Sequence, residues 1–308
     1  MEDLLNNYEK ITDLDYNKLF ASTSTIKNDF YKIWDKIIQK IDLDIISDKN
    51  CKEIENLVIY DILDGSRSTL ISKSKVDWDV ELTLYTLNII HTLRALSAKN
   101  CYIMIHTSYN RERGGKEFNQ VLKKIALGAP LIKKYAIQNN IRCSCIGMQE
   151  NYEYIHLLRD IMESTKNGHF HTYFLFDYNE KWILTRNAQI LLNNMPDIDV
   201  YIRHTKFQPS GGWIPGKMSR SAFLYSQNGS IYSNWDSDEL VTLLALSLLA
   251  KLLHKGEILN KTYITREEVD QRYRLRELEL FNKVIELQAN PKKLFMIGSP
   301  IGVYQFYY

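Results

Sequence analysis

The stretch LVIYDILDGSRS, residues 57–68, decides how this chain folds. Its first part, LVIYDIL (57–63), is a short apolar run rich in branched and aromatic residues, which is typical of a β-strand. The strand is followed directly by Asp64, Gly65, Ser66, Arg67 and Ser68. An Asp-Gly turn after a strand can present backbone N–H groups to phosphate oxygens, and its aspartate can hold Mg²⁺ or a proton. By itself this pentapeptide is more often an ordinary turn with a solvated arginine.

Helix-like and strand-like segments alternate after this first strand. Apolar residues recur at helical spacing through residues 79–96, and CYIMI (101–105) is a second strand, so the three segments form one βαβ unit. The alternation continues with helices near 116–138 and 152–165 and with strands at 141–146, 171–176 and 200–203. This pattern predicts an α/β fold with a mainly parallel central sheet flanked by helices. Ligand-binding groups are then expected at the carboxyl ends of the strands.

Helical additions are expected at both ends of this sheet. Residues 1–50 show polar–apolar periodicity without strand-like runs and are predicted to form an N-terminal helical extension, before one domain over residues 51–308. A charged helix is expected over 265–288. The apolar run 240–253 belongs to a helix starting near Asp238; it is shorter than the roughly 20 residues that cross a bilayer and contains a lysine. We expect this helix to be buried, and it is a candidate interface for a homodimer.

The charge balance argues against a nucleic-acid partner. Lys and Arg number 39 against 37 Asp and Glu, a net charge of +2, which offers no broad cationic surface for releasing counterions from a nucleic acid. The 4 cysteines show no zinc-binding spacing and fit the reduced thiols of a cytosolic protein. The first residues are polar and acidic and lack the basic and apolar blocks of a signal peptide. We therefore expect a cytoplasmic protein without a transmembrane segment.

The DGSRS turn, placed between a first strand and a long helix, resembles the cis-prenyltransferases, the family of undecaprenyl diphosphate synthase, whose first strand ends in Asp-Gly-Asn-Arg-Arg. Three further stretches resemble that family in the same order along the chain: Ile146-Gly147, Asp177-Tyr178-Asn179 and Asp199–Arg203 (DVYIR). The resemblance covers the larger part of the chain. It implies a cis-prenyltransferase-like catalytic domain over residues 51–308, in which Arg203 binds a diphosphate.

One branch of that fold, the tuberculosinol and tuberculosinyladenosine synthases, is a closer resemblance. It is carried by Glu112-Arg113-Gly114-Gly115, Gly216-Lys217 and the ending NPKKLFMIG (290–298), which ordinary chain-elongating enzymes lack. Enzymes of this branch ionise a diterpenyl diphosphate and let water or adenosine capture the cation. Two departures from the elongating enzymes agree with this: Ser68 stands in place of a second arginine, and Ser219-Arg220-Ser221-Ala222 offers no metal-binding glutamate.

A diphosphate-binding site follows from the resemblance and from the charges. We expect Asp64 and Arg67 to be catalytic, with Asp64 also serving as the Mg²⁺ ligand. The substrate diphosphate would be bound by Gly65, Ser66, Arg67, Ser68, Arg203, Lys206 and Lys217. Arginine suits this role because its planar fork binds phosphate oxygens bidentately. The alternatives are a surface arginine at the end of a strand for Arg203 and solvated lysines for Lys206 and Lys217.

Several side chains near the strand ends are candidates for stabilising or deprotonating a carbocation, or for lining the apolar tunnel of the substrate. They are Trp78, His106, Tyr109 and Trp213. The aromatic rings are equally explained as parts of the core or its rim, and His106 as a loop histidine with satisfied hydrogen bonds.

The predicted function is that of a Mg²⁺-dependent terpene synthase or prenyl transferase. Its small-molecule substrate would be an allylic prenyl diphosphate of C15 to C20, linear or already cyclised. Diphosphate would leave, and the cation would react with water, lose a proton or combine with a small acceptor, with release of the apolar product at a membrane surface. Two alternatives stay open: a chain-elongating cis-prenyltransferase, and a non-catalytic partner subunit of the same fold. Retention of Asp64 and Arg67 argues against the second.

Overall fold

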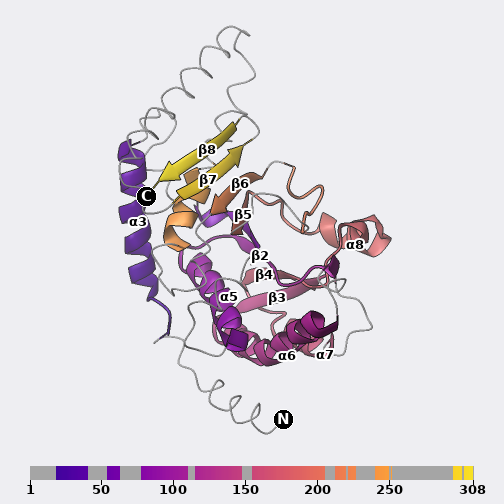
Figure 1. Cartoon of the computed structure of the whole chain (residues 1–308). Helices are drawn as coiled ribbons and strands as arrows, with labels where there is room; N and C mark the ends of the chain where they lie inside the picture. Colours follow the sequence, from indigo (N-terminus) through magenta and orange to yellow (C-terminus); the bar gives the residue numbers. More distant parts are fainter. Residues whose placement is uncertain are drawn as a thin grey trace.

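The computed structural model describes residues 19–40, 54–62, 78–109, 115–147, 155–204, 212–219, 221–226, 240–249, 251, 294–299 and 302–307. These residues form an eight-stranded sheet with helices packed along it (Figure 1). The strand order is β3-β4-β2-β1-β5-β6-β7-β8, so the first strand of the sequence lies inside the sheet, between β2 and β5.

Six of the strands are parallel, as the alternation of helices and strands predicts. They are β1 (Val58–Ile62), β2 (Asn100–Met104), β3 (Ile141–Ile146), β4 (Phe170–Leu175), β5 (Val200–His204) and β6 (Ala222–Ser226). The fold class predicted from the sequence is confirmed. The last two strands, β7 (Leu294–Ser299) and β8 (Gly302–Tyr307), extend the sheet from β6 as an antiparallel pair. The C-terminal addition therefore contains a β-hairpin, and the charged helix predicted over 265–288 lies outside the described residues.

The helices predicted at 79–96, 116–138 and 152–165 are present, with ends that differ by a few residues, and other helices accompany them. They are α3 (Thr23–Lys40), α5 (Trp78–Ala95), α6 (Gly115–Gln138), α7 (Ile155–Ser164), the short 3₁₀ helix η3 (Glu180–Leu184) and α8 (Arg186–Asn193). Residues 240–249 are also helical and buried, as expected for the apolar run that starts there. Within the described part of the chain, no helix is both long enough and apolar enough to cross a membrane.

Side chains alternate along the strands and so divide the core into two parts. Ile59 and its neighbours Cys101, Ile103, Val200 and Ile202 pack with α3, α5, α6, α7 and the 240–249 helix; we call this the helical face of the sheet. Tyr60, Tyr102 and Tyr201 point the other way and pack with η3, α8 and residues 213–218; we call this the aromatic face. Both faces are buried, which explains why the strands are almost continuously apolar.

The N-terminal helix α3 belongs to the core of the helical face. Phe30 and Trp34 are each only 1% exposed. Just before the helix, the carbonyl oxygen of Ala21 accepts a hydrogen bond from His91 Nε2 (2.9 Å), and His91 Nδ1 lies 2.7 Å from the Tyr135 hydroxyl on α6. Burial lowers the pKa of His91, which favours the neutral ring, in which Nε2 donates to Ala21 and Nδ1 accepts from the Tyr135 hydroxyl. The histidine thus joins the start of α3 to α5 and α6.

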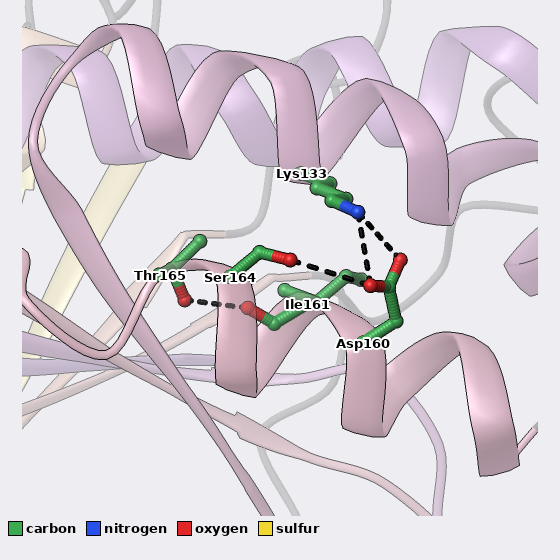
Figure 2. Close-up of polar contacts among 5 residues, drawn as sticks. All are labelled: Lys133, Asp160, Ile161, Ser164 and Thr165. Atoms are coloured by element: carbon green, nitrogen blue, oxygen red, sulfur yellow. Dashed lines mark hydrogen bonds and ion pairs between the residues drawn. The ribbon is translucent and has the colours of Figure 1, made fainter.

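Helices α6 and α7 are joined at the surface and anchored beneath it (Figure 2). Lys133 Nζ on α6 donates to both carboxylate oxygens of Asp160 on α7, at 2.9 and 2.7 Å, and this contact lowers the pKa of Asp160. The pair is exposed, so it contributes little to stability. Thr165, at the end of α7, donates to the Ile161 carbonyl oxygen (2.7 Å) and accepts from the backbone N–H of Cys143 on β3 (3.0 Å). The buried contact therefore fixes α7 against the sheet.

Aromatic side chains occupy one register position on the aromatic face in five neighbouring strands. We call them the aromatic row: Tyr173, Tyr102, Tyr60, Tyr201 and Phe223. Successive ring centroids lie 4.6, 6.1, 5.4 and 5.2 Å apart. Pairs at such distances contribute beyond their buried area. The row keeps this face of the sheet filled, and two of its hydroxyls bind covering segments: Tyr60 donates to the Gly212 carbonyl oxygen (2.6 Å) and Tyr102 to that of Pro196 (2.8 Å).

The packing of α5 on α6 yields a prediction about Gly128. A Cβ atom added there would lie 2.4 Å from Thr83 Oγ1 on α5, so Gly128→Ala should lower the unfolding temperature although alanine favours helix. Overpacking costs about 1–3 kcal/mol, against a helix-propensity gain of about 1 kcal/mol. Replacing Thr83 by Ala as well removes the clashing atom, so the double variant should be more stable than Gly128→Ala. Thermal denaturation of the wild type, Gly128→Ala, Thr83→Ala and the double variant tests this. If the two substitutions change the unfolding temperature additively, the two residues are not in contact.

Candidate functional site

Four strands end side by side at the carboxyl edge of the sheet. Ile62 at the end of β1 pairs with Met104 on β2 and with Arg203 on β5, and Met104 pairs with Leu175 on β4. In parallel strands the segments that follow such a row all leave the same edge of the sheet. The residues after β2 and β4 are described, and they place two ionisable side chains there.

His106 and Asp177 are these two residues, and they face each other. His106 Nδ1 lies 3.8 Å from Asp177 Oδ1, and the two residues are 2% and 1% exposed. The His106 ring lies against two phenylalanines on the helical side, with centroids 5.5 Å from Phe118 on α6 and 5.7 Å from Phe176. A histidine predicted from the sequence is thus paired with a buried carboxylate to which the sequence analysis assigned no chemistry.

The backbone beyond β2 and β4 holds this pair in place. Tyr178 N–H donates to the His106 carbonyl oxygen (3.1 Å), and Ser108 N–H donates to that of Tyr178 (3.0 Å). Asp177 has a φ of 51°, in the left-handed region that few non-glycine residues adopt. Gly147, at φ 84°, passes so close that a Cβ atom would lie 3.0 Å from the Phe176 carbonyl oxygen and from Tyr178 Cα. The chain therefore adopts a costly conformation at the aspartate.

Arg203 lies at the same edge but on the aromatic face. It follows Tyr201 by two residues on β5, and its Nη1 lies 3.4 Å from the Tyr201 hydroxyl. Only 4% of Arg203 is exposed, so the alternative of a surface arginine is wrong. Burial raises the pKa of the nearby Tyr60 hydroxyl; Glu180 adds to this effect, whereas Arg203 opposes it. Arg203 and Glu180 therefore both lie close to Tyr60.

The segment Gly212–Ile214 is bound over this part of the aromatic face. Glu180 Oε1 accepts hydrogen bonds from the backbone N–H groups of Gly212 (2.7 Å) and Trp213 (3.3 Å). Tyr178 donates to the Trp213 carbonyl oxygen (2.7 Å), and Tyr60 to that of Gly212. The Trp213 ring stacks on Phe223, with centroids 5.3 Å apart. Trp213 thus packs on the aromatic face, away from α5 and α6.

The structure does not bring Lys217 to Arg203. The carbonyl oxygen of Lys217 accepts from Ile198 N–H (2.8 Å), two residues before β5 begins, which places Lys217 at the amino edge of the sheet. Its ammonium donates to the Met195 carbonyl oxygen (2.7 Å) and to Asp197 (3.1 Å). The chain after β5 must return to the amino edge because β6 is parallel to β5. Lys217 therefore stabilises this return rather than joining a site at the other edge.

The remaining predicted site residues lie partly outside the described part of the chain. Asp64, Gly65, Ser66, Arg67, Ser68 and Lys206 lie outside the described residues. Trp78 is the first residue of α5. Tyr109 follows His106 by three residues and is 38% exposed. The sequence analysis missed Asp177 and Glu180 as site residues, although the Asp177-Tyr178-Asn179 stretch carried part of the family resemblance.

The described residues contain no group of three or more His, Cys, Asp or Glu side chains that could hold a metal ion. Asp64, the predicted Mg²⁺ ligand, is not among them. The Mg²⁺ site therefore stays a prediction.

The fold matches known structures although the sequence matches no protein-family model and no curated protein. The chain is similar to lavandulyl diphosphate synthase from Lavandula x intermedia, solved in complex with dimethylallyl diphosphate, with 15% identity, a TM-score of 0.53, and coverage of 63% of this chain and 96% of that one. It is also similar to a probable undecaprenyl diphosphate synthase from Campylobacter jejuni, with 14% identity, a TM-score of 0.45, and coverage of 60% and 91%. From the first likeness, the described sheet and helices have the cis-prenyltransferase fold. The resemblance to tuberculosinol synthases stays a prediction.

Glu180 should hold the Gly212–Ile214 segment. Glu180→Ala removes the acceptor of two backbone N–H groups, and hydrogen bonds to a charged group contribute about 1.5–3 kcal/mol, so the free energy of unfolding should fall by roughly that amount. Glu180→Gln keeps an oxygen acceptor and should lose less. Lys181→Ala, an exposed neighbour, is the control. Denaturant unfolding measures all three; equal stability of Glu180→Ala and Lys181→Ala would rule out this role.

Proposed function

We propose that this protein binds an allylic prenyl diphosphate at the carboxyl edge of its sheet and ionises it, releasing diphosphate. The observation that carries the proposal is the buried Arg203, paired in register with the last residue of β1. The DGSRS turn follows β1 in the sequence, with Asp64 two residues beyond Ile62. The same fold in lavandulyl diphosphate synthase, solved with dimethylallyl diphosphate bound, supports a ligand of this class.

Arg203 has the properties that a diphosphate ligand needs. Its side chain is fixed against the aromatic row, so little conformational entropy is lost when it binds phosphate oxygens. Covalent geometry keeps Asp64 within two residues, at most about 7 Å, of Ile62. Arg67 and Lys206 would add positive charge from the segments after β1 and β5. Lys217 is left out of this set because it lies at the opposite edge.

The chemistry follows from these charges. The bond between the allylic carbon and the diphosphate oxygen breaks, and its electron pair leaves with the diphosphate. Cationic groups that bind the departing anion more strongly than the bound substrate lower the barrier, at about 1.4 kcal/mol for each tenfold in rate. When bound, Mg²⁺ would neutralise further diphosphate charge, and Asp64 is the residue that would hold it. The hydrocarbon chain, C15 to C20, would lie along the apolar helical face between the sheet and α5 and α6.

We further propose that the cation reacts without a second diphosphate. Ser68 and the sequence Ser219–Ala222 lack the arginine and the carboxylate with which elongating enzymes hold isopentenyl diphosphate. A second candidate function, condensation of two prenyl diphosphates, is favoured by the name of the structural neighbour, a diphosphate synthase. We also propose that the protein is a cytoplasmic homodimer.

Incubation with prenyl diphosphates separates these possibilities. With Mg²⁺ and geranyl, farnesyl, geranylgeranyl or cyclised diterpenyl diphosphate, we expect diphosphate release and a terpene product of unchanged carbon number. Asp64→Asn and Arg67→Ala should each lower turnover about a hundredfold or more, because both act on charge that develops as diphosphate leaves. Mass spectrometry of products formed with labelled isopentenyl diphosphate supplies the counter-test. Label in longer products would establish condensation, and no diphosphate release from any substrate would leave the proposal without support.

Arg203 and Lys217 form a matched pair of basic residues at opposite edges of the sheet. Arg203→Ala should raise KM and lower kcat, because the arginine contacts diphosphate in the ground state and in the transition state. Lys217→Ala should leave both constants unchanged and lower only the unfolding temperature. Arg203→Lys keeps the charge but loses the planar fork, so its KM and kcat should lie between those of the wild type and of Arg203→Ala. Steady-state kinetics and thermal unfolding of each variant test this prediction. A kinetic defect in Lys217→Ala as large as that in Arg203→Ala would exclude a diphosphate site at the carboxyl edge of the sheet.

A further inference from the structure

The His106–Asp177 pair has no part in the binding of diphosphate proposed above. The two residues follow the ends of different strands. His106 Nδ1 lies 3.8 Å from Asp177 Oδ1, and both residues are almost fully buried. Burying an ionisable pair carries a desolvation penalty of several kcal/mol that the mutual attraction only partly offsets. Such a pair at the ligand edge of a sheet calls for a role beyond stability.

Two main-chain hydrogen bonds, Tyr178 N–H to the His106 carbonyl oxygen and Ser108 N–H to that of Tyr178, join the segments after β2 and β4, and Asn179 Nδ2 donates to Ser108 Oγ (2.9 Å) between the same segments. Any pair of side chains of similar volume would leave these bonds intact. The left-handed φ of Asp177 adds a further cost that an asparagine or glycine would reduce. The backbone conformation at the carboxylate thus adds to the desolvation cost of the buried pair.

The surroundings of His106 suit a carbocation. The ring centroids of Phe118 and Phe176 lie 5.5 and 5.7 Å from that of the imidazole, and both phenylalanines belong to the helical side of the core; aromatic rings attract cations through their faces. The pair also lies next to the first strand. Ile62 and Met104 are paired on adjacent strands, about 4.8 Å apart, and His106 follows Met104 by two residues just as Asp64 follows Ile62.

We propose that His106 is the base that ends the reaction, and that Asp177 is the positioning residue that orients it. This inference rests on the proposed function. After diphosphate has left, a C–H bond next to the cationic carbon breaks, and its electron pair forms a new carbon–carbon double bond. The proton passes to His106 Nε2, since Nδ1 faces Asp177, and the carboxylate stabilises the resulting imidazolium. The product is an alkene with one more double bond and the carbon number of the substrate, and no co-reactant is consumed.

The test separates ionisation from proton loss. Diphosphate released and alkene formed are measured together, by phosphate assay after pyrophosphatase and by gas chromatography with mass spectrometry. For the wild type we expect alkene in step with diphosphate. In His106→Gln the ratio of alkene to diphosphate should fall about tenfold or more, with alcohol from water capture in its place. His171→Gln is the matched control: this histidine lies on β4, bonded to Ser144 (2.8 Å), and its replacement should leave the ratio unchanged.

Asp177→Asn keeps the proposal falsifiable if His106→Gln does not fold. Asparagine has the shape of aspartate and tolerates left-handed φ, so this variant should fold and still lose alkene relative to diphosphate. Thermal unfolding checks the fold of each protein. An unchanged ratio in a folded His106→Gln or Asp177→Asn protein, or wild type that releases diphosphate but forms only alcohol, would overturn this inference alone. Absence of diphosphate release from the wild type would instead overturn the proposed function and the inference with it.

Discussion

The pairing of β1 with β2 on one side and β5 on the other is the constraint on which the site depends. Through Ile62 it aligns Met104 and Arg203 in one row, so the segments that follow three separate strands leave the sheet together. A slip of one residue in the β1–β5 register would turn Arg203 from the aromatic face to the helical face. Tyr201, on the same strand, would leave the aromatic row beside Tyr60 at the same time. The aromatic contacts and the position of the arginine are therefore specified together.

The two faces of the sheet have different chemistry because different elements cover them. The helical face is closed by apolar helices, and its thiols are inert: burial raises the pKa values of Cys101 and Cys143 to about 12. The aromatic face carries hydroxyls that bind backbone carbonyls, together with a half-buried His171 whose pKa burial lowers to about 4. Hydrocarbon is thus matched to the helical face. Charged ligand atoms are matched to the carboxyl edge of the sheet, where Arg203 lies near the end of β5.

The sequence alone predicts the elements well because helical and strand periodicities are local. It does not predict which strands become neighbours: β4 pairs with β2 although β3 lies between them in the chain, and only this order brings His106 to Asp177. Lys217 shows the opposite case. It belongs to the same loop region as Lys206, yet the return to parallel β6 carries it to the far edge. The apolar runs that became β7 and β8 have no local signal that distinguishes edge strands from core segments.

Under the proposed function, the positions of Arg203 and of the His106–Asp177 pair oppose the reversal of ionisation. One strand, β1, separates β5 from β2, so the two strands are about 10 Å apart; the arginine lies on the aromatic face, whereas His106 contacts the helical side. Arg203 attracts the diphosphate. With a neutral imidazole and an ionised carboxylate the pair would carry one negative charge and would attract the allylic cation in the opposite direction. At an effective dielectric constant of about 20, a unit charge about 5 Å away contributes about 3 kcal/mol, comparable to the loss when one fixed donor is removed from an oxyanion hole. Once the imidazole takes the proton, the pair becomes neutral and the attraction ends. The neutral alkene is then held by apolar contacts alone, which allows product to leave while diphosphate is still bound.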